Sequence, residues 1–220
     1  HLAGEPAAWA AIGFNVDAAG AVQLPSFRLL LVGREGRPAG GAVSLGLAGL
    51  AGVGCSSGEV VDVDGVPLHR CEAAPHSAAR HGNGVVGLDH LVLRTPDWRR
   101  TKASLAAAGL FPKRQTDKVR PGLVQLFYRA EGGPIIELVG PAKTELASTG
   151  SAKLWGLSFV SEDLDHTHER LRDCTRPPWG AVQAGRRITT LRGVSGVSLA
   201  VAFMSPHSGE APRKRESSKL

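Results

Sequence analysis

The sequence predicts an α+β protein of paired βαβββ units, because one pattern occurs twice along the chain. The segment GLDHLVLRTPDW (residues 87–98) returns in altered form as KLWGLSFVSEDL (residues 153–164). The ends also repeat, since IIELVGP (residues 135–141) returns as AVAFMSP (residues 200–206). The two copies are offset by 65 to 66 residues, which indicates an internal repeat of one structural unit.

Each copy contains the signals of one strand, one helix and three further strands. The first strand has alternating polar and apolar residues, and a helix is predicted to begin after Asp97 in one copy and Asp163 in the other. Short apolar stretches separated by turn residues complete each unit as strands. The limits are residues 84–141 for one unit and 152–206 for the next.

The residues before 84 predict less regular structure. Residues 1–50 look like a third, degenerate copy that lacks its beginning, because PAAWAAIGF (residues 6–14) parallels SLAAAGLF (residues 104–111). Residues 51–83 are predicted to be a connector. The elements expected here are a helix at 7–12, strands at 21–24, 26–32 and 42–47, and a hairpin at 59–68 that turns at Asp64-Gly65.

Composition and charge exclude several classes of function. No apolar run approaches the roughly 20 residues of a membrane helix. The net charge is +6, but the tail RKRESSKL (residues 213–220) carries +3 of it, which leaves +3 for the rest. Because the chain has one tyrosine and no aromatic residues interleaved with basic ones, a nucleic-acid partner is not expected.

The carboxyl-terminal tail, residues 207–220, is predicted to be disordered. It ends in Ser218-Lys219-Leu220, the tripeptide that the peroxisomal import receptor recognises. In a eukaryotic cell the expected location is the peroxisome, and otherwise the cytoplasm; a chance occurrence of the tripeptide is the alternative. Three cysteines without a CxxC spacing predict neither a zinc module nor a disulfide framework.

Residues 84–206 resemble the vicinal-oxygen-chelate superfamily, in particular its glyoxalase-like branch. The resemblance rests on DHLVLRTPDW, PIIELVGP, KLWGLSFVSEDLD and the later QAGRRITTLR. It implies that the units form a cupped, mixed or antiparallel sheet that holds a small molecule. The superfamily includes glyoxalase I, extradiol dioxygenases, epimerases and bleomycin-resistance proteins, so the resemblance does not specify a substrate.

The resemblance also implies a metal site in the cup. Family members take one ligand from the first and one from the last strand of each of two units, and these positions hold His90 and Glu137 in the first of the two units. Imidazole and carboxylate suit Zn, Fe, Mn or Ni. Strand alternation places His90 on one face with Val92 and Arg94.

The other unit departs from the metal-binding pattern. Gly156 stands at the position equivalent to His90, and Ala202 at that of Glu137, and neither side chain can bind a metal. A second copy in a homodimer can supply the missing ligands. The alternative is that His90 and Glu137 bond to each other or to a ligand in a metal-free cup.

Further ligand contacts are expected from both units. The paired guanidinium groups of Arg186 and Arg187 can clamp a carboxylate or a phosphate, which makes the expected ligand anionic; a solvated basic turn is the alternative. Gln125 and Phe127 share one face of a strand and are expected to line the cup, with Trp155 near its rim, although core packing also explains the aromatic residues.

Three functions remain from the sequence, and the last of them is a scaffold whose units serve only for assembly. The first is a glyoxalase-like enzyme, of lyase, isomerase or dioxygenase type, in which a metal held by His90 and Glu137 polarises substrate oxygens. The second is a non-catalytic small-molecule-binding protein of the bleomycin-resistance type. A hydrolase of the Gly-x-Ser-x-Gly class is not expected, because that motif does not occur in the chain.

Overall fold

The computed structural model describes most of the 220 residues of the chain. The described residues are 1–2, 4–25, 27–31, 45–47, 60–70, 79–118, 120–129, 133–143, 149–194 and 196–207. The predicted import signal and two of the three cysteines lie outside these residues, so peroxisomal import stays a prediction. Among the described residues, no helix is both long and apolar enough to cross a membrane.

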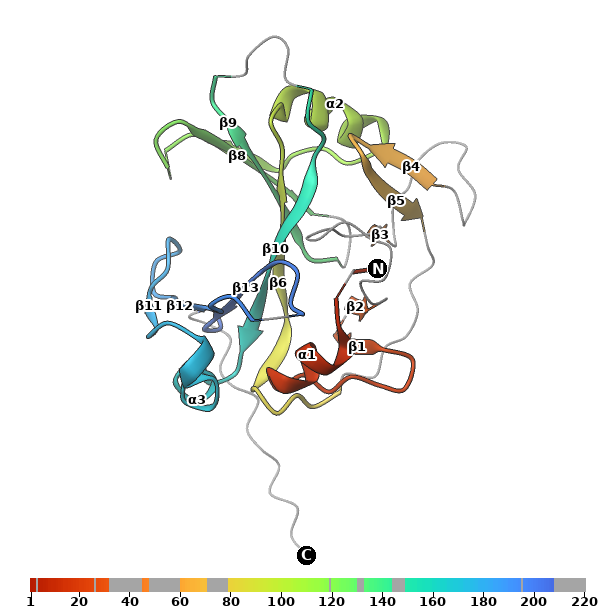
Figure 1. Cartoon of the computed structure of the whole chain (residues 1–220). Helices are drawn as coiled ribbons and strands as arrows, with labels where there is room; N and C mark the ends of the chain where they lie inside the picture. The colour runs from red at the N-terminus through yellow and green to blue at the C-terminus, as the bar shows by residue number, and fades with distance from the viewer. Residues whose placement is uncertain are drawn as a thin grey trace, which may run out of the picture.

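Two βαβββ units share one eight-stranded sheet, as the repeat predicts (Figure 1). The first unit comprises β6 (Val85–Arg94), α2 (Trp98–Ala107), β7 (Arg114–Thr116), β8 (Leu123–Arg129) and β9 (Ile135–Pro141). The second comprises β10 (Lys153–Ser161), α3 (Leu164–Arg170), a 3-10 turn (Arg172–Cys174), β11 (Trp179–Gly180), β12 (Arg187–Thr190) and β13 (Ala200–Met204). The strand order is β11-β12-β13-β10-β6-β9-β8-β7, so each unit has the same internal order.

The strand register shows a local pseudo-twofold axis between β6 and β10. These strands pair antiparallel, with His90 opposite Ser158 and Val92 opposite Gly156, and a shift of 66 residues exchanges these two pairs. Within each unit the first strand pairs parallel with the last, β6 with β9 and β10 with β13. The α+β, glyoxalase-like fold class predicted from the sequence is therefore confirmed.

Both unit helices begin where the sequence predicts. Asp97 caps α2 by accepting hydrogen bonds from the backbone of Arg99 and Arg100, and Asp163 caps α3 by accepting one from the backbone of His166. Such capping satisfies amide groups that have no partner inside the helix. The two helices therefore leave the sheet at equivalent points of the two units.

The apolar core lies on one face of the sheet and leaves the other face for the site. Alternate residues of β8 and β9 are buried, whereas β6 and β10 are buried in longer runs. The core includes Leu91, Leu93, Leu126, Ile136, Leu138, Leu157, Phe159, Val201 and Phe203. Helix α2 contacts β9, and α3 contacts β12 and β13. In Figure 1 the outer strands of both units lie to the same side of β6 and β10, so the sheet curves toward that side.

Residues 2–31 repeat the same topology with very short strands. The helix α1 (Pro6–Ala11) precedes a hairpin of β1 (Ala21–Leu24) and β2 (Phe27–Leu30). Single bridges join Leu2 to Leu31 in parallel and Val16 to Val22 antiparallel. The order of strand, helix and three strands, with the first parallel to the last, matches the large units.

A three-stranded sheet follows, in which β5 (Val66–Arg70) lies between β3 (Leu45–Leu47) and β4 (Val60–Val63). The hairpin predicted at Asp64-Gly65 is confirmed, and both turn residues have positive φ, at 52° and 86°. Because β3 pairs with β5, this sheet joins a strand of the predicted degenerate copy (residues 1–50) to the predicted connector (residues 51–83).

The amino-terminal segments pack onto the two large units. Trp9 and Phe14 lie against Phe159, and Phe14 also lies against Phe203, with ring centroids 4.9 to 6.5 Å apart. At the β4–β5 turn, Asp64 accepts a hydrogen bond of 2.7 Å from Arg100 Nε on α2. These contacts lie on the covered side of the sheet and do not enter the cup.

Candidate functional site

His90 and Glu137 lie together on the cupped face of the sheet. They belong to the neighbouring parallel strands β6 and β9, where Val92 is opposite Glu137. His90 Nε2 is 3.6 Å from Glu137 Oε2, and the two side chains are 16% and 13% exposed. A separation of roughly 3 to 5 Å is what a shared ion or proton requires. The structure thus brings together the two residues that the sequence singled out.

Asp89 holds the other nitrogen of the His90 ring. Asp89 Oδ2 lies 2.7 Å from His90 Nδ1. Burial raises the pKa of the Asp89 carboxyl, but the hydrogen bond with His90 and the charge of Arg186 outweigh burial and lower this pKa to about 2. An ionised carboxylate only accepts hydrogen bonds, so Nδ1 carries a proton. Consequently, in the neutral ring the lone pair is on Nε2, which faces Glu137.

A bulge in β6 places Asp89 beside the site. Between the pairs His90–Ser158 and Leu88–Phe159, β6 has one residue more than β10, and this residue is Asp89. Regular alternation puts neighbours on opposite faces, which is why the sequence did not single out Asp89. The pseudo-twofold repeats the bulge in β10, where the extra residue is Trp155, 66 positions later.

The two predicted arginines contact acidic residues of the protein. Arg186 is buried, with Nη2 2.7 Å from Asp89 Oδ1, and its Nε donates a hydrogen bond to the Ser205 carbonyl. Arg187 is exposed and makes two contacts of 2.7 and 2.8 Å with Asp165 on α3. Contact of either guanidinium with a ligand stays a prediction. Arg186 instead supports His90 through Asp89.

Gln125 and Phe127 extend from β8 on the same face. The Gln125 side-chain amide donates a hydrogen bond of 2.6 Å to Glu137 Oε1, while its own Oε1 is buried and has no hydrogen-bond partner among the described residues. Phe127 is opposite Glu137 in the sheet register, with the Arg114 guanidinium 4.6 Å from its ring centre. Both residues therefore adjoin the His90–Glu137 pair, and their contact with a ligand stays a prediction.

The second unit contributes small side chains to the site. Gly156 and Ala202 occupy the positions related by the pseudo-twofold to His90 and Glu137, as the sequence alignment predicts. Ser158, which the sequence analysis missed, is directly opposite His90, and paired residues on adjacent antiparallel strands project from the same face. Its hydroxyl is buried and has no hydrogen-bond partner among the described residues.

Only the unit that contains His90 and Glu137 supplies donor atoms for a divalent ion. Two donor atoms 3.6 Å apart, His90 Nε2 and Glu137 Oε2, can both lie about 2.0 to 2.2 Å from one ion. The hydrogen bond from Nδ1 to Asp89 is typical of metal-binding histidines. However, the described residues contain no group of three or more His, Cys, Asp or Glu side chains placed to hold a metal. Gln125 Oε1 and water would have to complete the shell.

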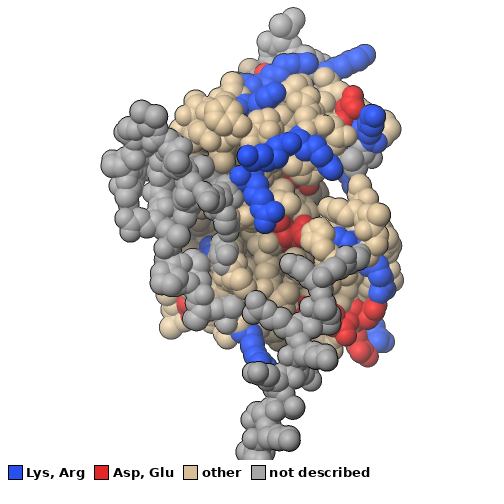
Figure 2. Space-filling view, turned by 180° about the vertical axis from the view of Figure 1, so that it is seen from behind, with Lys and Arg blue, Asp and Glu red and all other residues tan. Residues whose placement is uncertain are grey.

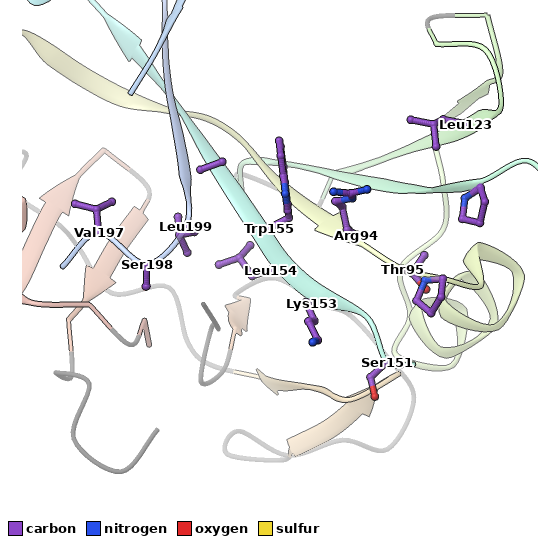
Figure 3. A pocket seen from close by; sticks show the side chains of 13 residues that line it. Arg94, Thr95, Leu123, Ser151, Lys153, Leu154, Trp155, Val197, Ser198 and Leu199 are labelled. Atoms are coloured by element: carbon purple, nitrogen blue, oxygen red, sulfur yellow. The ribbon is translucent and has the colours of Figure 1, made fainter. Parts of the chain in front are cut away.

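An open groove of about 780 Å³ lies farther along the same face. Its cationic and aromatic lining comes from Arg94 at the end of β6 and from Lys153 and Trp155 at the start of β10 (Figure 3). Trp155 is 46% exposed, and the Arg94 guanidinium is 5.6 Å from its ring centre. Figure 2 shows Lys and Arg side chains gathered around the middle of one face of the molecule. Trp155, predicted near the rim of the cup, lines this groove, and its contact with a ligand stays a prediction.

Comparisons with solved structures reveal weak similarities. The methylmalonyl-CoA epimerase from Mycobacterium tuberculosis is 17% identical, with a TM-score of 0.45 over 56% of this chain and 89% of that chain. A Streptomyces coelicolor methylmalonyl-CoA epimerase in complex with 2-nitronate-propionyl-CoA is 19% identical, with a TM-score of 0.45 over 58% and 99%. A hypothetical protein from Bacillus halodurans is 14% identical, with a TM-score of 0.43 over 54% and 93%. No family model and no curated protein matches the sequence.

Proposed function

We propose that this protein is a small-molecule enzyme of the glyoxalase-like type that moves a proton on its substrate, as isomerases and some lyases do. The observation that carries the proposal is the arrangement of Asp89, His90 and Glu137. His90 is held by a carboxylate on Nδ1 and presents Nε2 to a second carboxylate 3.6 Å away. Acid–base catalysis requires such a positioned pair.

The two groups have complementary roles in proton transfer. Either Glu137 Oε2 or His90 Nε2 can accept a proton from a carbon or oxygen atom of a bound substrate. The other group can then receive this proton, or it can donate a proton to another atom of the substrate. Asp89 stabilises the imidazolium form of His90 once Nε2 is protonated, because the carboxylate remains ionised. Gln125 fixes the orientation of Glu137 through its amide.

A divalent ion can be accommodated at the same place. His90 Nε2 and Glu137 Oε2 would hold Zn, Fe, Mn or Ni, and a bound ion would supply Lewis-acid stabilisation of negative charge on substrate oxygens. Gly156 and Ala202 have no side-chain atom that could bind the metal. This incomplete donor set favours weak binding of the metal, which supports the non-catalytic binding protein as the second candidate function.

The test measures proton transfer and metal binding separately. Tag-free full-length protein is incubated in deuterium oxide with a panel of small oxo acids and acyl thioesters, and NMR follows the exchange of their carbon-bound protons. We expect His90→Ala and Glu137→Gln each to lower an exchange rate by about 10²- to 10⁴-fold. Calorimetry with Zn²⁺ and Mn²⁺ on the chelator-treated protein should show weaker binding in both variants.

Matched controls are available on α3. His166→Ala and Glu169→Gln remove the same chemical groups at exposed positions and should leave both measurements unchanged. If His90→Ala and Glu137→Gln exchange protons as fast as the wild type, the proposed enzyme is wrong. If the wild type shows no proton exchange, but His90→Ala and Glu137→Gln bind the metal more weakly than the wild type, the non-catalytic binding protein is favoured.

A further inference from the structure

The groove beyond the His90 site is lined by two positively charged residues that are paired across adjacent strands. Arg94 is paired with Lys153 in the register of β6 and β10, and both side chains line the groove. Like charges in this arrangement destabilise a sheet unless an anion lies between them. Within the described parts of the chain, neither side chain forms an ion pair, although Arg100, Arg186 and Arg187 each do.

An exposed aromatic face lies next to these charges. Trp155 is the bulged residue of β10, so its indole projects beside Arg94 on the groove side (Figure 3). Exposed tryptophan next to an arginine is a combination that stacks planar groups and attracts their negative substituents. Because a bulge re-aims a side chain, Trp155 is placed by the backbone irregularity and not by core packing.

We propose that this groove binds a planar, anionic group of a small molecule. The ring of the ligand stacks on Trp155, and its carboxylate or phosphate binds the neighbouring guanidinium of Arg94, with Lys153 as a second positive charge in the groove. A guanidinium group binds either anion with two parallel hydrogen bonds, while the lysine adds a point charge. Both anions share this chemistry, and the experiment below distinguishes them.

The position of the groove also defines the size of the substrate. Arg94 is four residues beyond His90 on the same face of β6, which corresponds to roughly 13 Å along a strand. A molecule with its planar anionic end in the groove therefore reaches His90 and Glu137 only if it is elongated. This last step rests on the proposed function, whereas binding in the groove does not.

The test uses simple probes of the groove. Calorimetry measures the binding of 2-naphthoate, 2-naphthyl phosphate and neutral 2-naphthol to the full chain. We expect at least one anion to bind about tenfold or more tightly than the naphthol, and the tighter anion identifies the preferred group. Arg94→Gln, Lys153→Gln and Trp155→Leu should each weaken its binding by about fivefold or more.

Controls separate this site from the surface and from the catalytic pair. Trp179→Leu removes a tryptophan that is 43% exposed outside the groove, and Lys113→Gln removes an exposed lysine; both should bind like the wild type. His90→Ala should also retain the affinity, even if it abolishes proton exchange. Equal binding of naphthol and both anions, or unchanged affinity in the three groove variants, would overturn the proposal.

Discussion

At the scale of single residues, the sequence singled out His90 and Glu137 but not Asp89, which holds the His90 ring. His90 and Glu137 could be singled out because polar residues on apolar strands are unusual, and because the resemblance stated above implies metal ligands at these two strand positions. Asp89 could not be found, since strand alternation places it on the other face and only a bulge turns it toward His90. Arg186 was singled out as a ligand contact, whereas its structural partner is the buried carboxylate of Asp89.

The buried pair of Asp89 and Arg186 predicts a specific dependence of stability on pH. A carboxyl whose pKa is lowered to about 2 contributes stability above its unfolded pKa of about 4, and this contribution disappears as pH falls from 4 to 2. We expect Asp89→Asn to lower the free energy of unfolding at pH 7 by about 2 kcal/mol or more, because Arg186 is also left unpaired. Urea unfolding at pH 7 and pH 3 should show a smaller difference from the wild type at the lower pH.

Asp165→Asn is the matched control for this prediction. It removes a carboxylate that also pairs with an arginine at 2.7 Å, but both partners are exposed. Exposed ion pairs contribute little, so this variant should unfold like the wild type at both pH values. If Asp89→Asn lowers the free energy of unfolding as little as Asp165→Asn does, or by the same amount at both pH values, the role assigned to the buried pair is contradicted.

At the scale of elements, the repeat in the sequence predicted both the strands and their symmetry. The 66-residue offset exchanges the pairs His90–Ser158 and Val92–Gly156 of β6 and β10, so the predicted equivalence of Gly156 with His90 agrees with the register. What the sequence did not reveal is how closely β13 approaches this glycine. A Cβ atom at position 156 would lie 3.0 Å from the Ala200 carbonyl oxygen and 3.3 Å from its Cβ.

This close approach predicts that Gly156 is required for the packing of β10 against β13. Gly156→Ala should lower the free energy of unfolding by about 1 to 3 kcal/mol, because the strands must separate to admit the methyl group. Gly87→Ala is the control, since no atom lies within 4 Å of a Cβ built there, and it should be neutral or slightly stabilising. Equal stability of the two variants in urea would show that β13 can move away from position 156 without loss of stability. The same crowding means that a histidine side chain at position 156 would collide with Ala200.

At the scale of the whole molecule, the amino-terminal residues close the side of the sheet that the site does not use. Trp9 and Phe14 complete the core over β10 and β13, and the β4–β5 turn contacts α2. The sequence indicated a degenerate copy here from a short likeness between two helices. It could not predict the pairing of β3 with β5, because such short strands carry almost no periodic signal and their partners are set by tertiary contacts.

His81 connects this amino-terminal part to the sheet, and its environment predicts a loss of stability in mild acid. Its Nδ1 accepts a hydrogen bond of 3.1 Å from the backbone N–H of Asn15, so its Nε2 carries the proton that is donated to the Gln23 carbonyl. Burial lowers the pKa of His81 and outweighs the contact with the Gln23 carbonyl, which raises it. Since the unfolded chain takes up a proton near pH 6.5 and the folded one resists it, stability falls as pH drops below about 6.5.

His81→Gln should reduce this dependence, because glutamine does not titrate in that range. We expect the drop in the free energy of unfolding between pH 7.5 and pH 5.5 to be smaller in this variant than in the wild type, as measured by urea titrations at both pH values. His166→Gln, at an exposed position of α3, serves as the control and should keep the wild-type drop. An identical drop in His81→Gln and the wild type would mean that the protonation of His81 does not weaken the junction. In that case the aromatic packing of Trp9 and Phe14 on Phe159 would be what holds residues 2–31 to the sheet in acid.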